Sequence, residues 1–273
     1  MLLPDLIREA LPAEFLVAVQ QAPPHLIGAA CFRYGGAVLY SVRLRVIRTH
    51  RRRGIGSALM SAVLAEARSR GCDTVVALVE TDREPEAEPF LLRYGFRRGS
   101  RLTTVEAAAE PARAWFGALR RRLEDAGKIP ETARVLSFAE APKAEVARLY
   151  AEAILCSPEL EPGRLQHVLE RLASPQSPVA MEGDRVVGAL LWSLEGSLAF
   201  VHARVVAEER RRGWVNVVLM ADALEAGWRA GGRRLRFEIP DGNRDTEKLA
   251  SRLNAQPVRR LDRYVLELRG RSP

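Results

Sequence analysis

Hydrophobic and polar residues alternate along several short stretches of the chain and recur at helical spacing along others. Val42, Leu44 and Val46 are separated by arginines, which predicts a strand with one buried face. Between residues 55 and 63 the apolar residues recur at the 3.6-residue period of a helix with one buried side. Residues 74–79 are apolar throughout, and a run of strand length with that composition predicts burial on both faces.

Extending this reasoning along the chain predicts alternating strands and helices. In the first half we expect a short helix at 5–11, strands at 15–19, 26–34 and 37–47, a helix from 55 to a stop at Gly71, a strand at 74–79, a helix at 85–94, a strand at 96–105 and a helix at 106–122. In the second half we expect a strand at 134–138, helices at 143–155 and 162–173, strands at 178–182, 185–193 and 197–206, a helix at 213–230, a strand at 235–239, a helix at 243–254 and one or two strands at 258–268.

The connection between the strand at 37–47 and the following helix is rich in arginine and glycine. It consists of Arg51, Arg52, Arg53, Gly54, Ile55, Gly56 and Ser57. Glycine allows a sharp turn and a close approach of the backbone to a ligand. The first N–H groups of a helix lack partners within it and carry partial positive charge, so the loop suits a phosphate-bearing ligand. A plain strand–turn–helix connection with solvated arginines would have the same pattern.

Composition narrows the class of protein. The chain has 273 residues, 47% of them hydrophobic, which is enough for one large or two ordinary folded domains. The net charge of +8 favours anionic partners without choosing among them, and a soluble arginine-rich surface would give the same charge. The three cysteines are widely spaced, so we expect neither a disulfide framework nor a metal site. We see no signal peptide and no apolar run long enough to cross a membrane, and we expect a cytoplasmic protein.

The order of predicted elements occurs twice. Residues 210–213 repeat the Arg-Arg-Arg-Gly sequence of residues 51–54 at an offset of 159, the separation of Gly54 from Gly213. Upstream, residues 27–29 resemble residues 187–189 at an offset of 160, the separation of Gly28 from Gly188. Matches at a nearly constant offset favour two copies of one fold. The first copy is the shorter one, since it lacks the strand and the two helices predicted at 134–173.

With these motifs the sequence resembles the GNAT acetyltransferase superfamily in tandem form. The resemblance rests on Val46-Ile47 followed by Arg51-x-x-Gly54-x-Gly56, and on the Gly-Phe ending of residues 90–96. It implies an α/β fold of two tandem GNAT-like domains, each a mixed, splayed β-sheet flanked by helices. The first copy is shortened at its N-terminal end, and the second is full length but degenerate. We predict a first domain at 1–105, a bridging helix and linker at 106–132 and a second domain at 133–273.

The resemblance also implies acetyl-CoA as co-substrate and direct acyl transfer to an amine, without a metal. The first loop should then bind the pyrophosphate through its backbone, and the strand edge at Val46 and Ile47 should pair with the pantetheine amides. The family's usual acid, a tyrosine, is replaced by Leu91, and the family's asparagine seven residues earlier is replaced by Glu84. In the second copy these positions are Ala250 and Asn243. Val215 falls on the position of Gly56, where we expect its side chain to crowd a bound phosphate.

Two side chains are candidates for the chemistry of the first copy. Glu80, at the end of the strand at 74–79, is the candidate base, although it could equally be a solvated carboxylate. Tyr94 could replace the missing acid or could pack in the core, and Glu84 and His50 are weaker candidates for a role in the site.

The first hypothesis is therefore an N-acetyltransferase acting on an amine that the sequence does not identify, either a small molecule or a peptide. The second hypothesis is a non-catalytic acyl-CoA-binding protein, because both copies lack the tyrosine. Nucleic-acid binding is not favoured, since the arginines cluster at the two loops and no nucleic-acid motif is recognised.

Overall fold

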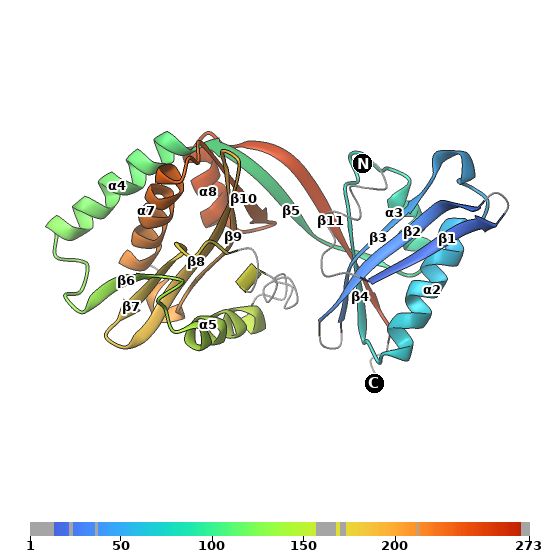
Figure 1. Ribbon diagram of the computed structural model, residues 1–273, viewed down its shortest axis with the longest axis horizontal. Coiled ribbons are helices and arrows are strands. Elements are labelled where there is room, and N and C mark those ends of the chain that lie inside the picture. Colours follow the sequence, from blue (N-terminus) through green and yellow to red (C-terminus); the bar gives the residue numbers. More distant parts are fainter. Residues whose placement is uncertain are drawn as a thin grey trace. The chain divides into compact units, whose positions relative to one another are not determined.

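The computed structural model describes residues 14–21, 24–35, 38–156, 168–169, 173–211 and 213–268 (Figure 1). The helix predicted at 5–11 lies outside the described residues, and so does most of the helix predicted at 162–173. The chain forms two compact units. The first comprises Met1–Leu102 and Arg260–Pro273, and the second comprises Thr103–Arg259.

The first unit is a mixed sheet covered on one face by two helices. Its elements are β1 (Glu14–Gln21), β2 (Pro24–Gly35), β3 (Val38–Val46), α2 (Ile55–Ser69), β4 (Thr74–Val79), α3 (Ala87–Arg93), the beginning of β5 (Arg97–Ala108) and the end of β11 (Gln256–Glu267). The strand order is β1-β2-β3-β4-β11-β5. The pair β3–β4 is parallel, whereas β1–β2, β2–β3 and β4–β11 are antiparallel. The predicted strand at 74–79 is confirmed at both ends.

The core of the first unit lies between the sheet and its two helices. The buried stripe of α2 includes Leu59 and Val63, which pack with Val75 of β4. Helix α3 adds Leu91, and the chain after it adds Phe96. This packing fixes the start of α2 beside the end of β3, so the arginine and glycine loop rests on a rigid support.

The second unit has helices on both faces of its sheet. Its elements are α4 (Ala109–Asp125), β6 (Ala133–Ser137), α5 (Lys143–Cys156), β7 (Pro178–Glu182), β8 (Arg185–Glu195), β9 (Leu198–Val206), α7 (Trp214–Arg229), β10 (Arg234–Pro240) and α8 (Arg244–Arg252), together with the remaining parts of β5 and β11. The strand order is β5-β10-β9-β8-β7-β6, with β9–β10 parallel. Helices α4, α7 and α8 contribute to one core cluster, and α5 to another on the opposite side of the sheet (Figure 1).

Equivalent strand pairs show that the two units repeat one arrangement. Gly28 pairs with Val46 across β2 and β3, and Gly188 pairs with Val206 across β8 and β9. The offset in this region is therefore 160, the separation of Gly28 from Gly188. The offset of 159 predicted for the loop and the helix after it holds only at the N-caps, Gly54 and Gly213, because α7 begins one residue early relative to α2. The strand register before the loop and the packing of both helices on the strands follow 160.

The corrected offset changes the interpretation of Val215. Its counterpart is Ile55, and the counterpart of Gly56 is Asn216. The prediction that Val215 crowds a bound phosphate is wrong, because its side chain is fully buried. It packs so tightly on β8 that a Cβ added to Gly188 would lie 2.5 Å from its Cγ1. The second loop is nevertheless degenerate, since it has lost both glycines of the pattern.

The division of the chain into compact units differs from the predicted domain boundaries in two places. Helix α4 packs in the core of the second unit through Ala112 and Phe116. The end of β11 belongs to the first unit, where Asp262–Glu267 pair with β4. The extent of each ancestral repeat stays a prediction, whereas the folded first unit includes the last strand of the chain.

Candidate functional site

The loop of the first unit makes a tight turn between β3 and α2. A single turn of 3₁₀ helix, Arg48–His50, follows β3, and Arg52 then adopts a left-handed conformation with φ of 59°. Gly54 is also left-handed, with φ of 81°, and is the N-cap of α2. Such a conformation favours glycine because it has no Cβ. A Cβ added to Gly54 would meet no atom within 4 Å, so the backbone borders open space.

The first turn of α2 presents backbone donors at this open space. The first helical hydrogen bond runs from Ala58 N to Gly54 O, at 2.9 Å. The N–H groups of Ile55, Gly56 and Ser57 precede it and have no carbonyl of the helix to donate to. No side chain caps them. Three converging donors at the positive end of a helix suit an anion such as a pyrophosphate.

Strands β3 and β4 separate at the end nearest this loop. Their last paired residues are Val42 and Ala77, although β3 continues to Val46 and β4 to Val79. The strand edge at Val46 and Ile47 is thus free of β4 where the family resemblance expects the pantetheine. Ile47 is exposed, as a strand end at an open site should be.

Two arginine side chains lie across this separated region. Arg45 forms an ion pair with Glu84, and both side chains are about one-fifth exposed, at 21% and 23%. Arg51 donates from Nε to the carbonyl of Val46, at 3.2 Å, and from a terminal nitrogen to Glu86, at 3.0 Å. Arg51 therefore occupies a carbonyl of the predicted pantetheine edge. Arg52 and Arg53 are exposed at the loop surface.

The candidate base lies at the end of β4. Glu80 is 9% exposed, and a nitrogen of Arg83 approaches its carboxylate to 3.2 Å. The carbonyl of Glu80 accepts hydrogen bonds from the N–H groups of Arg83 and Glu84, each at 2.8 Å. Glu80 is thus the first residue of a hydrogen-bonded turn that follows β4.

The candidate acid, Tyr94, lies beside the loop instead. Its hydroxyl donates to the carbonyl of Ser57, at 3.3 Å, and its ring packs on Phe90 at a centroid distance of 5.2 Å. The weaker candidate His50 shares a hydrogen bond with Gln20, at 3.2 Å, and meets the ring of His25 edge-on.

The residues at the positions of the family's tyrosine and asparagine have structural roles in this fold. Leu91 and Ala250 are buried in the cores of their units. Asn243 caps α8 by accepting a hydrogen bond from the N–H of Thr246, at 3.1 Å. Glu84 forms an ion pair with Arg45. Leu91 and Ala250 therefore offer no hydroxyl at the positions where the family pattern has its tyrosine.

Sequence reasoning missed a buried carboxylate beside the candidate base. Asp262 of β11 is 2% exposed and pairs with Val79, the residue before Glu80. It accepts a hydrogen bond from Thr81 and two from Arg101, at 2.8 and 3.2 Å, and forms an ion pair with Arg98 at 3.1 Å. Burial by itself would raise the pKa of Asp262, but the hydrogen bonds from Arg101, Thr81 and Arg98 outweigh burial and lower this pKa to about 2. Asp262 alternates with Tyr264 and Leu266, and this alternation indicated that the three residues share one face of a strand. No pattern in the sequence, however, assigned that strand to the first unit.

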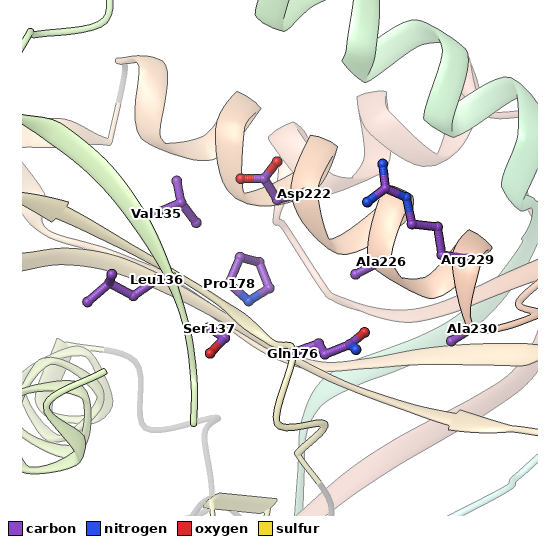
Figure 2. Close-up of a pocket in the computed structure, with 9 residues that line it drawn as sticks. All are labelled: Val135, Leu136, Ser137, Gln176, Pro178, Asp222, Ala226, Arg229 and Ala230. Carbon is purple, nitrogen blue, oxygen red and sulfur yellow. The ribbon is translucent and has the colours of Figure 1, made fainter. Parts of the chain in front are cut away.

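The second unit has a separate depression of about 420 Å³, on the side of the sheet that α7 covers (Figure 2). Val135 and Pro178 form its wall, and Asp222, Arg229 and Ser137 are polar groups around it. Each of these three is already bonded, respectively to Arg120, Glu225 and Glu140. The depression is open and its charges are neutralised, so it adds nothing to the site at the first loop.

Two features are absent from the part of the chain that the structure describes. No helix among them is long and apolar enough to cross a membrane. Within the same residues, no group of three or more His, Cys, Asp or Glu side chains is arranged to hold a metal ion.

Comparison with known proteins finds a likeness to one family in the first part of the chain. Residues 3–96 match the model of the acetyltransferase (GNAT) family, and this stretch contains the loop, the separated strands and both candidate catalytic side chains. The family consists mostly of acyltransferases. No curated protein matches the chain by sequence.

Solved structures extend the likeness to the whole chain. A GCN5-related N-acetyltransferase from Sphaerobacter thermophilus has a TM-score of 0.70 at 16% identity, over 98% of this chain and 86% of that chain. A tandem GNAT protein from the clavulanic acid biosynthesis pathway has a TM-score of 0.62 at 18% identity, over 96% of this chain and 86% of that chain. A GCN5-related N-acetyltransferase from Kribbella flavida has a TM-score of 0.57 at 16% identity, over 97% of this chain and 64% of that chain. The chain therefore has a GNAT-like α/β fold, and its first part carries the resemblance to the acetyltransferase family.

Proposed function

We propose that the chain is an N-acetyltransferase, which transfers an acetyl group from acetyl-CoA to an amine acceptor and binds acetyl-CoA at the first unit. One observation carries this proposal: the unpaired N–H groups at the start of α2 adjoin the strand edge that β4 leaves open. The family match over residues 3–96 supports it. The acceptor can be a small molecule or a peptide, and no metal takes part.

The loop fits the phosphate part of acetyl-CoA. Its first helical N–H groups donate to the pyrophosphate, and Arg51, Arg52 and Arg53 supply positive charge around it. The open space beside Gly54 leaves room for the phosphate oxygens. The loop of the second unit lacks the left-handed glycine, because its N-cap, Gly213, is extended with φ of −108°. We therefore place the co-substrate in the first unit alone.

The strand edge fits the pantetheine part. Val46 offers backbone groups that β4 does not use, and an extended amide chain can pair with them as an added strand does, whereas the N–H of Ile47 donates to Ile27 of β2. Arg51 has to leave the carbonyl of Val46 for this pairing. Its guanidinium then becomes available to the pyrophosphate.

Glu80 acts as the base of the proposed reaction. It accepts the proton that the amine loses as nitrogen bonds to the acetyl carbon, and the carbon–sulfur bond breaks to release CoA as a thiolate. The backbone N–H of Val46 stabilises the negative charge on the carbonyl oxygen, because the N–H of Ile47 donates to the carbonyl of Ile27 at 2.9 Å. Tyr94 is the candidate donor of a proton to the thiolate, for which its hydroxyl has to leave the carbonyl of Ser57.

A second candidate function is acyl-CoA binding without transfer. It is favoured by Leu91, which is 4% exposed and packs in the core where the family places its acid. The Arg45–Glu84 ion pair also lies across the region where the strands separate. Both observations concern the chemical step and leave the phosphate loop intact.

One experiment separates the two functions. Titration calorimetry measures acetyl-CoA binding, and release of free CoA is followed against a panel of small amines, lysine peptides and peptide N-termini. Binding with turnover on at least one amine supports the transferase, and Glu80→Gln should then lower kcat at least tenfold. Binding without turnover on any amine supports the carrier, and absence of binding contradicts both functions.

A further inference from the structure

The last strand of the chain borders the turn that carries the candidate base. In the register of β4 and β11, Asp262 lies opposite Val79, the last residue of β4. Glu80 follows Val79 directly. Within the β4–β11 pairing, Asp262 is thus the residue of β11 that lies opposite the last residue before Glu80.

Two contacts join β11 to the residues just after Glu80. The hydroxyl of Thr81 donates to Asp262, and a nitrogen of Arg260 lies 3.8 Å from a carboxylate oxygen of Asp82. Arg260 and Asp82 are exposed, so the second contact is the weaker one. The first is a hydrogen bond to a buried, ionised carboxylate, which is a strong kind of hydrogen bond in a protein.

Asp262 is itself held firmly. A buried carboxylate stays ionised only when partners compensate for the loss of water, and Arg98 and Arg101 of β5 supply that compensation. Its low pKa agrees with this geometry. Asp262 therefore links β5, β11 and the turn after β4 into one network.

This carboxylate is specific to the last strand. Strands β5 and β11 begin at Arg97 and Gln256, which are 159 residues apart, and at that offset the counterpart of Asp262 is Thr103. The matching position of the first repeat thus carries no charge. The network cannot be explained as a feature common to both copies of the fold.

We propose that Asp262 is a positioning residue for acetyl transfer, which holds the Glu80 turn through Thr81. The second repeat then has a role in the reaction although its own loop is degenerate, because its last strand supplies this residue to the first unit. The inference rests on the proposed function for its catalytic part. The positioning itself is a statement about the turn and can be measured without turnover.

The sharpest perturbation is Thr81→Val, which removes the hydroxyl and preserves size and charge. Hydrogen exchange should show the amides of Arg83 and Glu84, which donate to the carbonyl of Glu80, exchanging about tenfold faster than in the wild type. With the amine found in the panel, kcat should fall about tenfold while KM for acetyl-CoA stays within twofold. Thr81→Ser, which restores the hydroxyl, should recover both quantities.

Two further variants complete the design. Asp262→Asn should give a larger effect of the same kind, although it leaves two arginines without their carboxylate and can lower stability. Glu267→Gln is the matched control, because Glu267 lies on the same strand and accepts a hydrogen bond from Thr74 at 3.1 Å, at the opposite end of the β4–β11 pairing from Asp262. It should change neither exchange at the turn nor kcat.

The outcomes separate the inference from the proposed function. Unchanged exchange at Arg83 and Glu84 in Thr81→Val overturns the positioning, whatever the activity. Faster exchange with unchanged kcat overturns the link to catalysis. A wild type that turns over no amine contradicts the proposed function and the catalytic part together, and the exchange data then still decide whether Asp262 holds the turn.

Discussion

Replacing Gly54 by alanine separates the backbone requirement of the loop from side-chain packing. Gly54 has φ of 81° and ψ of −10°, and an added Cβ would meet no atom within 4 Å. The whole cost is therefore conformational, about 1–2 kcal/mol for a left-handed residue other than glycine. Gly183 provides a matched control, since it has φ of 61°, equally open surroundings and a place far from the loop in the sequence.

Thermal and urea unfolding should show the same loss of stability for Gly54→Ala and for Gly183→Ala. A loss of about 1 kcal/mol lowers the melting temperature by roughly 2–4 °C in a chain of this size. Calorimetry with acetyl-CoA should separate them. Gly54→Ala should weaken binding at least about tenfold, because relief of the strain shifts the N–H groups at the start of α2, whereas Gly183→Ala should bind as the wild type does.

A third variant, Gly56→Ala, tests the same reasoning, but here the expected change is a gain of stability. A Cβ on Gly56 would lie 3.7 Å from side-chain atoms of Leu44 and Phe90, an ordinary contact. Gly56→Ala should therefore raise stability by up to about 1 kcal/mol and keep acetyl-CoA binding. Equal affinity of the wild type and Gly54→Ala would refute the assignment of the loop. Loss of stability in Gly56→Ala would refute the geometric argument.

Two further predictions concern stability. Gly188→Ala should destabilise the protein by about 1–3 kcal/mol, because its Cβ would lie 2.5 Å from Val215. Gly28→Ala should cost less, since its nearest contact is 3.1 Å; urea unfolding of both variants measures the difference, and equal losses would contradict the closer packing of Val215 on Gly188. Asp262 has a folded-state pKa of about 2, below its ordinary 3.8, so its charge stabilises the fold above about pH 4. Between pH 4 and pH 2 the wild type should lose about 2 kcal/mol more than Asp262→Asn, and parallel pH profiles of the two proteins would contradict this.

The elements of this fold were predictable because the periodicity is strong. The strand at 74–79 is confirmed, and the helix predicted to start at Ile55 starts there. The shift of one residue in the alignment of the two repeats was not predictable. Matching arginines in a loop carry no packing constraint, whereas the constraint that fixes the register is the contact between a glycine of one strand and the first turn of a helix. Such a contact becomes visible only in three dimensions.

The candidate site was predictable in part for a similar reason. Its loop is a continuous stretch of sequence, so the residues that form it could be named together. Asp262 is 181 residues from Thr81, and only the pairing of β11 with β4 brings them together. Local patterns cannot reveal which strand closes a sheet when that strand lies in the other repeat. The roles of Glu80 and Tyr94 stay predictions, and the experiments above test the first of them directly.

The position of β11 has a consequence for the synthesis of the protein. The sheet of the first unit is complete only after residues 260–267 have been translated, although its other strands up to Leu102 are made long before. At ordinary elongation rates the interval is roughly 10–30 s, during which one edge of β4 has no neighbour. An unpaired apolar edge is a hazard for aggregation. We therefore expect ribosome-bound chains that have passed the first repeat to depend on chaperones, and a detached first repeat to need the β11 sequence for solubility.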